Sequence, residues 1–238
     1  MSRRQQHIMV VGAHCGDAEV MAGGIVAKYT AHGHKASIVH LTAGEKGNRK
    51  MSPEAYAAQK REEALAAGEV LGADVYFLPY KDGEIPLDEG PKFALCDLIR
   101  QVKPTVILTH WKESIHKDHA YTSLIAEDAR FYAAVPAFER ELPAHGAWGF
   151  LYCENWEDPF GYRPDIYIDI TDVFDTYVKA MEQYELFRGG VSSFRYIDYY
   201  KALAVTRGCL ANCQYAQTLM RPRDILATKH DAIPGFDL

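Results

Sequence analysis

The sequence predicts an α/β fold in which a mostly parallel sheet is flanked by helices. Short apolar runs alternate with helix-like segments over residues 1–135. These runs are continuous, which is typical of strands buried on both faces of a parallel sheet. No linker, repeat or low-complexity segment divides the chain. Right-handed strand–helix–strand units of this kind build a Rossmann-like sheet.

Strands and helices are expected to alternate over residues 1–135. The strands are expected at 7–13, 35–42, 73–79 and 105–110, and the helices at 19–33, 52–72, 91–103 and 119–134. The helix at 52–72 has the clearest boundaries, with Ser52 as N-cap, Pro53 at its first position and Gly72 after its end.

The last third of the chain changes character, because aromatic, β-rich segments precede its helices. Strands are expected at 148–156 and 165–171, and helices at 172–189 and 197–221. We therefore expect one domain over residues 1–238. It would consist of a βαβ core over 1–135 and a small β-rich and helical C-terminal subregion over 148–238.

Composition indicates an ordinary soluble protein, with 48% hydrophobic and 24% charged residues among 238. The net charge of −6 gives no basic field for nucleic acid or an anionic membrane. No stretch approaches the ~20 apolar residues that span a bilayer. The five cysteines are odd in number and form no C-x-x-C pair, which favours a reduced, cytoplasmic protein. A small molecule is the expected partner.

Three polar clusters follow strands of the predicted sheet. Residues 14–19 follow the first strand, 42–50 the second and 110–119 the fourth. In open parallel sheets, ligands bind beyond the carboxyl ends of the strands. We therefore expect these clusters to form one site.

The first and third clusters have the spacing of metal ligands. His14 and Asp17 are three residues apart, as are His116 and His119, with Asp118 between the latter pair. Two histidines and a carboxylate with one open position are a common zinc set in hydrolytic enzymes. Such an ion lowers the pKa of bound water to about 7. The spacing alone leaves open that these residues only cap helices or bind backbone groups.

Two other interpretations of the first loop are weaker. A dinucleotide fingerprint needs G-x-G-x-x-G, and the spacing of Gly12, Gly16 and Gly23 does not match it. Cys15, close to a helix N-terminus and to His14, could instead be a nucleophile of lowered pKa or a soft metal ligand.

With these motifs the chain resembles the PIG-L/LmbE-like deacetylases, zinc enzymes that remove N-acetyl groups from amino-sugar conjugates. Their opening motif A-H-P-D-D-x-E, followed by a glycine pair, aligns without a gap with residues 13–19 and Gly23-Gly24. Their H-P-D-H motif aligns with residues 116–119. Segments 41–47, 61–63 and 163–180 also resemble their counterparts, so the resemblance spans most of the chain.

The resemblance implies a role for each matched residue. It makes His14, Asp17 and His119 the zinc ligands. It places His116 beside the oxyanion that develops in the reaction, with Asp118 orienting or tuning that histidine. It also implies self-association, since such relatives often form trimers or hexamers.

The chain departs from the family at the general base. The family's first aspartate is Gly16 here, and the preceding proline is Cys15. Glu45, Glu113 and Asp118 lie in the same loops and could replace that base, and Glu45 is the first candidate. Alternatively, the reaction proceeds with little proton-transfer assistance, or catalysis is lost. A further departure is Gln217, where the family often has a glutamate.

Taken together, these features predict a zinc-dependent hydrolase, an N-deacetylase of an N-acetylated amino sugar or sugar conjugate. The alternatives are a catalytically silent metal- or sugar-binding homologue and a metal hydrolase of another amide or ester. Aromatic residues, Trp111 and Trp156 first among them, could line a sugar-sized pocket, although such side chains are more often core.

Overall fold

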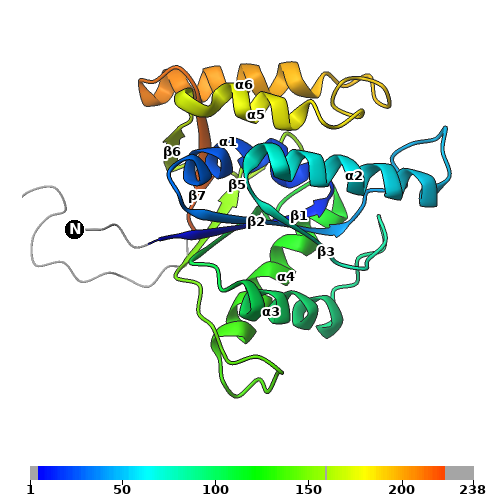
Figure 1. Cartoon of the computed structure of the whole chain (residues 1–238), viewed down its shortest axis with the longest axis vertical. Helices are drawn as coiled ribbons and strands as arrows, with labels where there is room; N and C mark the ends of the chain where they lie inside the picture. The colour runs from blue at the N-terminus through cyan, green and yellow to red at the C-terminus, as the bar shows by residue number, and fades with distance from the viewer. Residues whose placement is uncertain (1–4, 159, 223–238) are drawn as a thin grey trace, which may run out of the picture.

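The computed structural model describes residues 5–158 and 160–222 and shows one seven-stranded sheet in the order β3-β2-β1-β4-β5-β7-β6 (Figure 1). The strands β3, β2, β1, β4 and β5 run parallel, and β7 runs antiparallel to both of its neighbours. The predicted α/β class is confirmed. The strands are β1 (His7–His14), β2 (Lys35–Thr42), β3 (Asp74–Phe77), β4 (Val106–His110), β5 (Gly149–Cys153), β6 (Ile166–Asp169) and β7 (Ala216–Met220).

Helices cover both faces of this sheet, as Figure 1 shows. The helices α1, α2, α5 and α6 lie on one face, with α5 and α6 outermost, and α3 and α4 pack together on the other. Their bounds are α1 (Asp17–Ala31), α2 (Pro53–Leu71), α3 (Glu89–Val102), α4 (Lys117–Ala134), α5 (Phe174–Met181) and α6 (Tyr196–Ala211), with a 3₁₀ turn η1 (Thr171–Val173) before α5.

Strand β1 shows why the apolar runs are continuous. Ile8 and Val10 belong to the core under α1 and α2, whereas Met9 and Val11 belong to the core under α3 and α4. All four side chains are buried. Successive residues of a strand point to opposite faces, so a strand covered on both sides needs apolar residues throughout.

Two of the C-terminal expectations were wrong. The helix predicted at 197–221 ends at Ala211, because Asn212 adopts a left-handed backbone with φ of 57°, and residues 216–220 form β7 instead. The helix predicted at 172–189 is the 3₁₀ turn η1 followed by the short α5, which ends at Met181. Hence the C-terminal subregion extends the same sheet.

The glycine pair in α1 lets β7 and α5 approach that helix closely. A Cβ on Gly23 would lie 3.0 Å from the ring of Tyr177 in α5, and a Cβ on Gly24 would lie 2.9 Å from Gln217 Oε1 in β7. The side-chain amide of Gln217 forms two hydrogen bonds with the backbone of α1. Its Oε1 accepts from Ile25 N at 3.0 Å, and its Nε2 donates to Val20 O at 3.1 Å. The last described strand is therefore fastened to the first helix.

None of the helices in the described part of the chain has both the length and the apolar character needed to cross a bilayer.

Candidate functional site

The carboxyl ends of β1 and β4 lie side by side, and three side chains converge beyond them. His14 ends β1, Asp17 begins α1 and His119 lies in the first turn of α4. Asp17 Oδ2 is 3.1 Å from His14 Nδ1 and 3.2 Å from His119 Nε2. The two imidazole nitrogens are 3.3 Å apart. The fold thus brings together the three residues that the motifs predicted as ligands.

The spacing and chemistry of this triad fit a zinc-like ion. Bonds of about 2.0–2.1 Å in a tetrahedral site place ligand atoms about 3.3 Å apart. All three separations in the triad lie between 3.1 and 3.3 Å. Two imidazoles and one carboxylate also leave a fourth position for water or substrate.

Carboxylates stand behind both imidazoles of the triad. His14 Nε2 lies 3.2 Å from Asp82 Oδ1, and His119 Nδ1 lies 3.2 Å from Glu157 Oε2. Metal-bound histidines commonly donate their second N–H to a carboxylate, which fixes the ring orientation and strengthens the ligand. This second layer of partners is typical of a metal centre and is more than helix capping requires.

The surroundings favour an ionised Asp17 and a protonated His14, whereas burial, followed by the charge of His110, lowers the pKa of His119. Burial raises the pKa of Asp17, but the positive charges of His119 and His14 outweigh it and hold that pKa well below its usual range. Burial lowers the pKa of His14, but the negative charge of Asp17 and hydrogen bonds to Asp118 outweigh it and raise that pKa well above its usual value.

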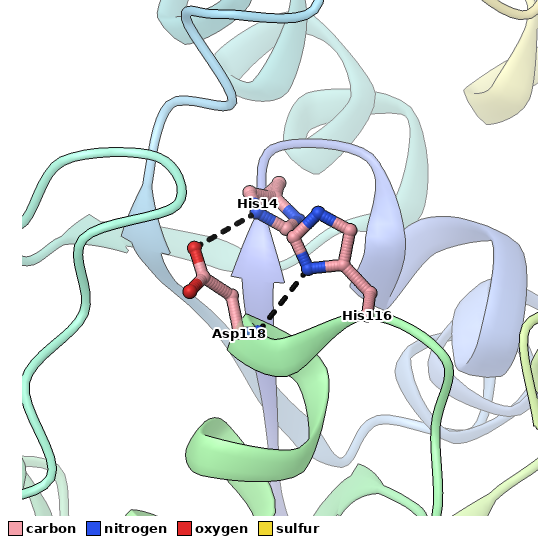
Figure 2. Close-up of side chains that lie close together, drawn as sticks. All are labelled: His14, His116 and Asp118. Carbon is pink, nitrogen blue, oxygen red and sulfur yellow. Dashed lines mark hydrogen bonds and ion pairs between the residues drawn. The ribbon is translucent and has the colours of Figure 1, made fainter.

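His116 and Asp118 lie next to the triad at the start of α4 (Figure 2). Asp118 N donates to His116 Nδ1 at 3.2 Å, so Nε2 carries the proton when this ring is neutral. Burial is the largest cause that lowers the pKa of His116, followed by the charge of His14. The Asp118 carboxylate faces His14 rather than His116, with Oδ2 3.4 Å from His14 Nε2 and accepting from Gly83 N at 2.6 Å.

His14, His116 and Asp118 also bring potential ligand atoms within 4.8 Å of one another. However, His116 Nδ1 already accepts a hydrogen bond from Asp118 N, whereas within the described residues no backbone N–H donates to the imidazole of His14 or of His119. The triad of His14, Asp17 and His119 therefore offers the better ligand set.

Of the three candidate bases from the loops, Asp118 lies against His14, whereas Glu45 and Glu113 lie farther out. Glu45 Oε1 accepts from Asp82 N at 3.0 Å, and Glu45 is not among the residues that line the cavity beside the triad. Glu113 is exposed. Asp82 and Glu157 do line that cavity. Both follow strand ends, β3 and β5, so the rule that singled out the other clusters could have found them.

Cys15 is buried and its thiol donates weakly to Thr42 O at 3.7 Å. Burial raises the pKa of this thiol, which disfavours the thiolate that a nucleophile or soft ligand would need.

Glu19, the last residue of the first motif, supports the turn from beneath. Its Oε1 accepts from Tyr184 OH at 2.8 Å and lies 3.4 Å from His40 Nε2. His40 Nδ1 in turn lies 3.2 Å from His14 O. These buried contacts link Glu19 through His40 to the backbone carbonyl of His14. Glu19 is therefore a positioning residue for His14.

The turn at Gly16 is closed to a side chain. Gly16 has φ of 109°, and a Cβ there would lie 2.6 Å from Phe187 Cζ. The place where the family carries its aspartate is therefore next to an aromatic ring in this chain.

A cavity of about 260 Å³ opens beside the triad. Trp156 lines it, whereas Trp111 donates to Phe160 O at 2.8 Å and belongs to the core. Lining residues that the sequence did not single out include Lys60, Asp82, Asn155, Glu157, Phe187 and Tyr196.

Comparison with known proteins gives relatives with two kinds of activity. The family model described as PIG-L, GlcNAc-PI de-N-acetylase, matches residues 9–130, more than half of the chain. A 4-oxalmesaconate hydratase of Pseudomonas putida is 29% identical over 220 residues, which cover 89% of this chain and 83% of that protein. A 1D-myo-inositol 2-acetamido-2-deoxy-alpha-D-glucopyranoside deacetylase of Catenulispora acidiphila is 31% identical, over 60% of this chain and 52% of its own length.

Solved structures show the same division. The 4-carboxy-2-hydroxymuconate hydratase of Pseudomonas putida superposes with a TM-score of 0.85 at 28% identity, over 96% of this chain and 100% of that one. The N,N'-diacetylchitobiose deacetylase of Pyrococcus horikoshii gives 0.79 at 20% identity, over 91% and 84%. At 20% identity, the similarity to the diacetylchitobiose deacetylase shows a shared fold and no more.

Proposed function

Because this chain belongs to the PIG-L family, we propose that it is a metal-dependent enzyme that activates water in the cavity beside β1 and β4. His14, Asp17 and His119 would hold a zinc or similar divalent ion. The observation that carries this proposal is the triad itself, three donor atoms within 3.3 Å of one another with a carboxylate behind each imidazole.

When bound, a divalent ion supplies a positive charge that acidifies water and polarises a carbonyl group. His116 contributes a neutral imidazole whose Nε2–H can donate to an oxygen that gains negative charge in the reaction. Asp118 holds His14 from behind and fixes His116 through its backbone N–H.

The proton removed from water needs an acceptor. We propose that Glu45 assists this step from behind the cavity wall, either by accepting the proton through a bridging water or by holding the backbone of Asp82, which lines the cavity. General acid–base assistance is worth about 10²- to 10⁴-fold in rate. Glu45 and Asp82, which are linked by this hydrogen bond, would therefore act together in the proton transfer.

The favoured reaction is addition of water to a small unsaturated carboxylate. The hydratase names found for Pseudomonas putida refer to such acids, and the sequence match to the 4-oxalmesaconate hydratase covers 89% of this chain. The closed turn at Gly16 also removes the aspartate that the resemblance assigns to N-deacetylation. In such a hydration, the hydroxyl group of water bonds to one alkene carbon and a proton bonds to the other.

Hydrolysis of an N-acetyl amino sugar, the reaction predicted from the sequence, is the second candidate. The family description and the deacetylases among the relatives support it.

One experiment separates the two reactions. Zinc-loaded protein and chelator-treated protein would be incubated with 4-oxalmesaconate and, separately, with N-acetylated glucosaminyl-inositol. We expect the unsaturated acid to be consumed only when the metal is present, and its absorbance measures this loss. Metal-dependent acetate release alone would instead support the deacetylase. Turnover of neither class would contradict the hydratase and the deacetylase alike and leave a metal-binding homologue.

A further inference from the structure

Lys60 is a buried cation at the cavity. It lies in α2 and is 2% exposed, yet it lines the cavity beside the triad. Within residues 5–158 and 160–222, no carboxylate lies at ion-pair distance from its ammonium group and no hydrogen bond uses it. By contrast, Lys46 and Lys92, on the protein surface, pair with glutamates at 2.5 and 3.1 Å.

Aromatic rings surround the Lys60 ammonium. Nζ lies 4.6 Å from the centre of the Tyr184 ring and 5.6 Å from that of Phe187. It is also 3.5 Å from the position that a Cβ on Gly16 would take, directly before the ligand Asp17. These rings attract the cation through their faces but accept no conventional hydrogen bond, so its three N–H groups stay available.

The carboxylates of the cavity are engaged elsewhere. Asp82 lies against His14, and Glu157 lies against His119. A buried charge without a counter-charge is unfavourable, and such groups concentrate where a ligand completes the pairing.

We propose that Lys60 binds a carboxylate group of the substrate while the reacting atoms lie over the triad, an inference that rests on the proposed water-activating function. The ammonium group donates hydrogen bonds to the carboxylate oxygens. A carboxylate group, with one negative charge, suits the position beside Lys60 better than a phosphate group with two, because the single ammonium group neutralises one charge. The site therefore selects acids over neutral amino sugars.

Malonate is a suitable probe, because it tests binding without turnover. Isothermal titration of zinc-loaded protein would compare wild type with Lys60→Met, which keeps the length and removes the charge. We expect malonate to bind at least about tenfold more weakly to Lys60→Met, with zinc content unchanged. Lys60→Arg retains the charge and should keep most of the affinity.

Lys46→Met is the matched control, because Lys46 is an exposed lysine of the loop after β2 and pairs with Glu84. Lys46→Met should bind malonate as wild type does. This result would show that malonate binding depends on direct contact with Lys60 and not on the total positive charge of the protein. If Lys60→Met does not fold, Lys60→Gln replaces it. Equal malonate affinity in the neutral variant and wild type would overturn the proposal, as would Lys60-dependent binding of inorganic phosphate tighter than that of malonate.

The two proposals fail in different ways. Lys60-dependent malonate binding without turnover of any substrate would refute the enzyme and keep the carboxylate site. Unchanged kcat/KM for an unsaturated acid in Lys60→Met would keep the enzyme and refute the carboxylate site.

Discussion

The two walls of the cavity are built in different ways. The metal wall consists of His14, Asp17, His116 and His119, and two short motifs at neighbouring strand ends supply it. The rest of the lining, which we call the opposite wall, contains Lys60 from α2 and, from distant parts of the chain, Trp156, Phe187 and Tyr196. On the metal wall nearly every polar atom has a charged partner, whereas the cation of the opposite wall has none among the described residues.

The difference teaches that the walls do separate work. In our proposal, the mutually paired groups would hold an ion whatever the substrate, and the unpaired ammonium group of Lys60 would bind a negative charge of the substrate. Variants of the metal wall should therefore change metal content, and variants of the opposite wall should change substrate binding or stability without changing metal content. The following predictions test this division.

The largest effect is expected from removal of a ligand. His14→Ala and His119→Ala should each abolish stoichiometric zinc, measured by elemental analysis, and lower kcat/KM by about 10³-fold or more, since several kcal/mol of charge stabilisation are lost. His32→Ala, which changes an exposed histidine, is the control. Full zinc retention in both ligand variants would reject the triad.

Next in size is the effect of Glu45→Gln. We expect kcat to fall by about 10²-fold or more with zinc content unchanged, because proton transfer loses its carboxylate while the glutamine amide oxygen can still accept from Asp82 N. Glu54→Gln, an exposed change at the start of α2, should leave kcat alone. Wild-type turnover in Glu45→Gln would remove Glu45 as the proton acceptor.

A smaller effect on zinc affinity is expected from the carboxylates that contact the ligand histidines. Glu157→Gln should weaken zinc affinity by about 10- to 100-fold, because His119 Nδ1 loses its carboxylate partner. Competition with a chromophoric chelator measures this affinity. Glu113→Gln serves as a control, since Glu113 is exposed; equal affinities in the two variants would contradict the supporting role of Glu157.

The smallest expected effect is a loss of stability caused by a side chain at Gly16, which lies between the two walls. Gly16→Asp should lower the free energy of unfolding by about 1–3 kcal/mol, because φ of 109° and the Phe187 ring both oppose a side chain. Thermal melting of Gly16→Asp, of Phe187→Ala and of the double variant measures it. Phe187→Ala is destabilising by itself because the ring is buried, but the further loss caused by Gly16→Asp should be smaller in that background than in wild type. An unchanged melting temperature in Gly16→Asp alone would show that the turn admits a side chain.

The sequence predicted the metal wall better than the opposite wall for a physical reason. The first motif and the motif at 116–119 are local, and the parallel sheet places strand ends together, so His14 and His119 could be expected to meet. Lys60 becomes part of the site only through packing of α2 against residues 184–187, which no local pattern reveals.

The same limit explains the C-terminal errors. Residues 197–221 have helical composition, but Asn212 ends α6 and the open edge of β5 recruits residues 216–220 as a strand. Tertiary pairing overrode local propensity there. The one-domain boundary, the cytoplasmic location and self-association stay predictions.

The bond between Gln217 and α1 has a consequence for how the protein assembles. The amide of Gln217 reaches across 192 positions to Ile25, on the same helix that begins with Asp17. A nascent chain emerging from the ribosome can pair β1, β2 and β4 early, yet this anchor on α1 has to wait until residue 217 has been synthesised. Contacts so distant along the chain form late and slow the search for the native state. Full metal affinity should accordingly be one of the last properties that the maturing protein acquires.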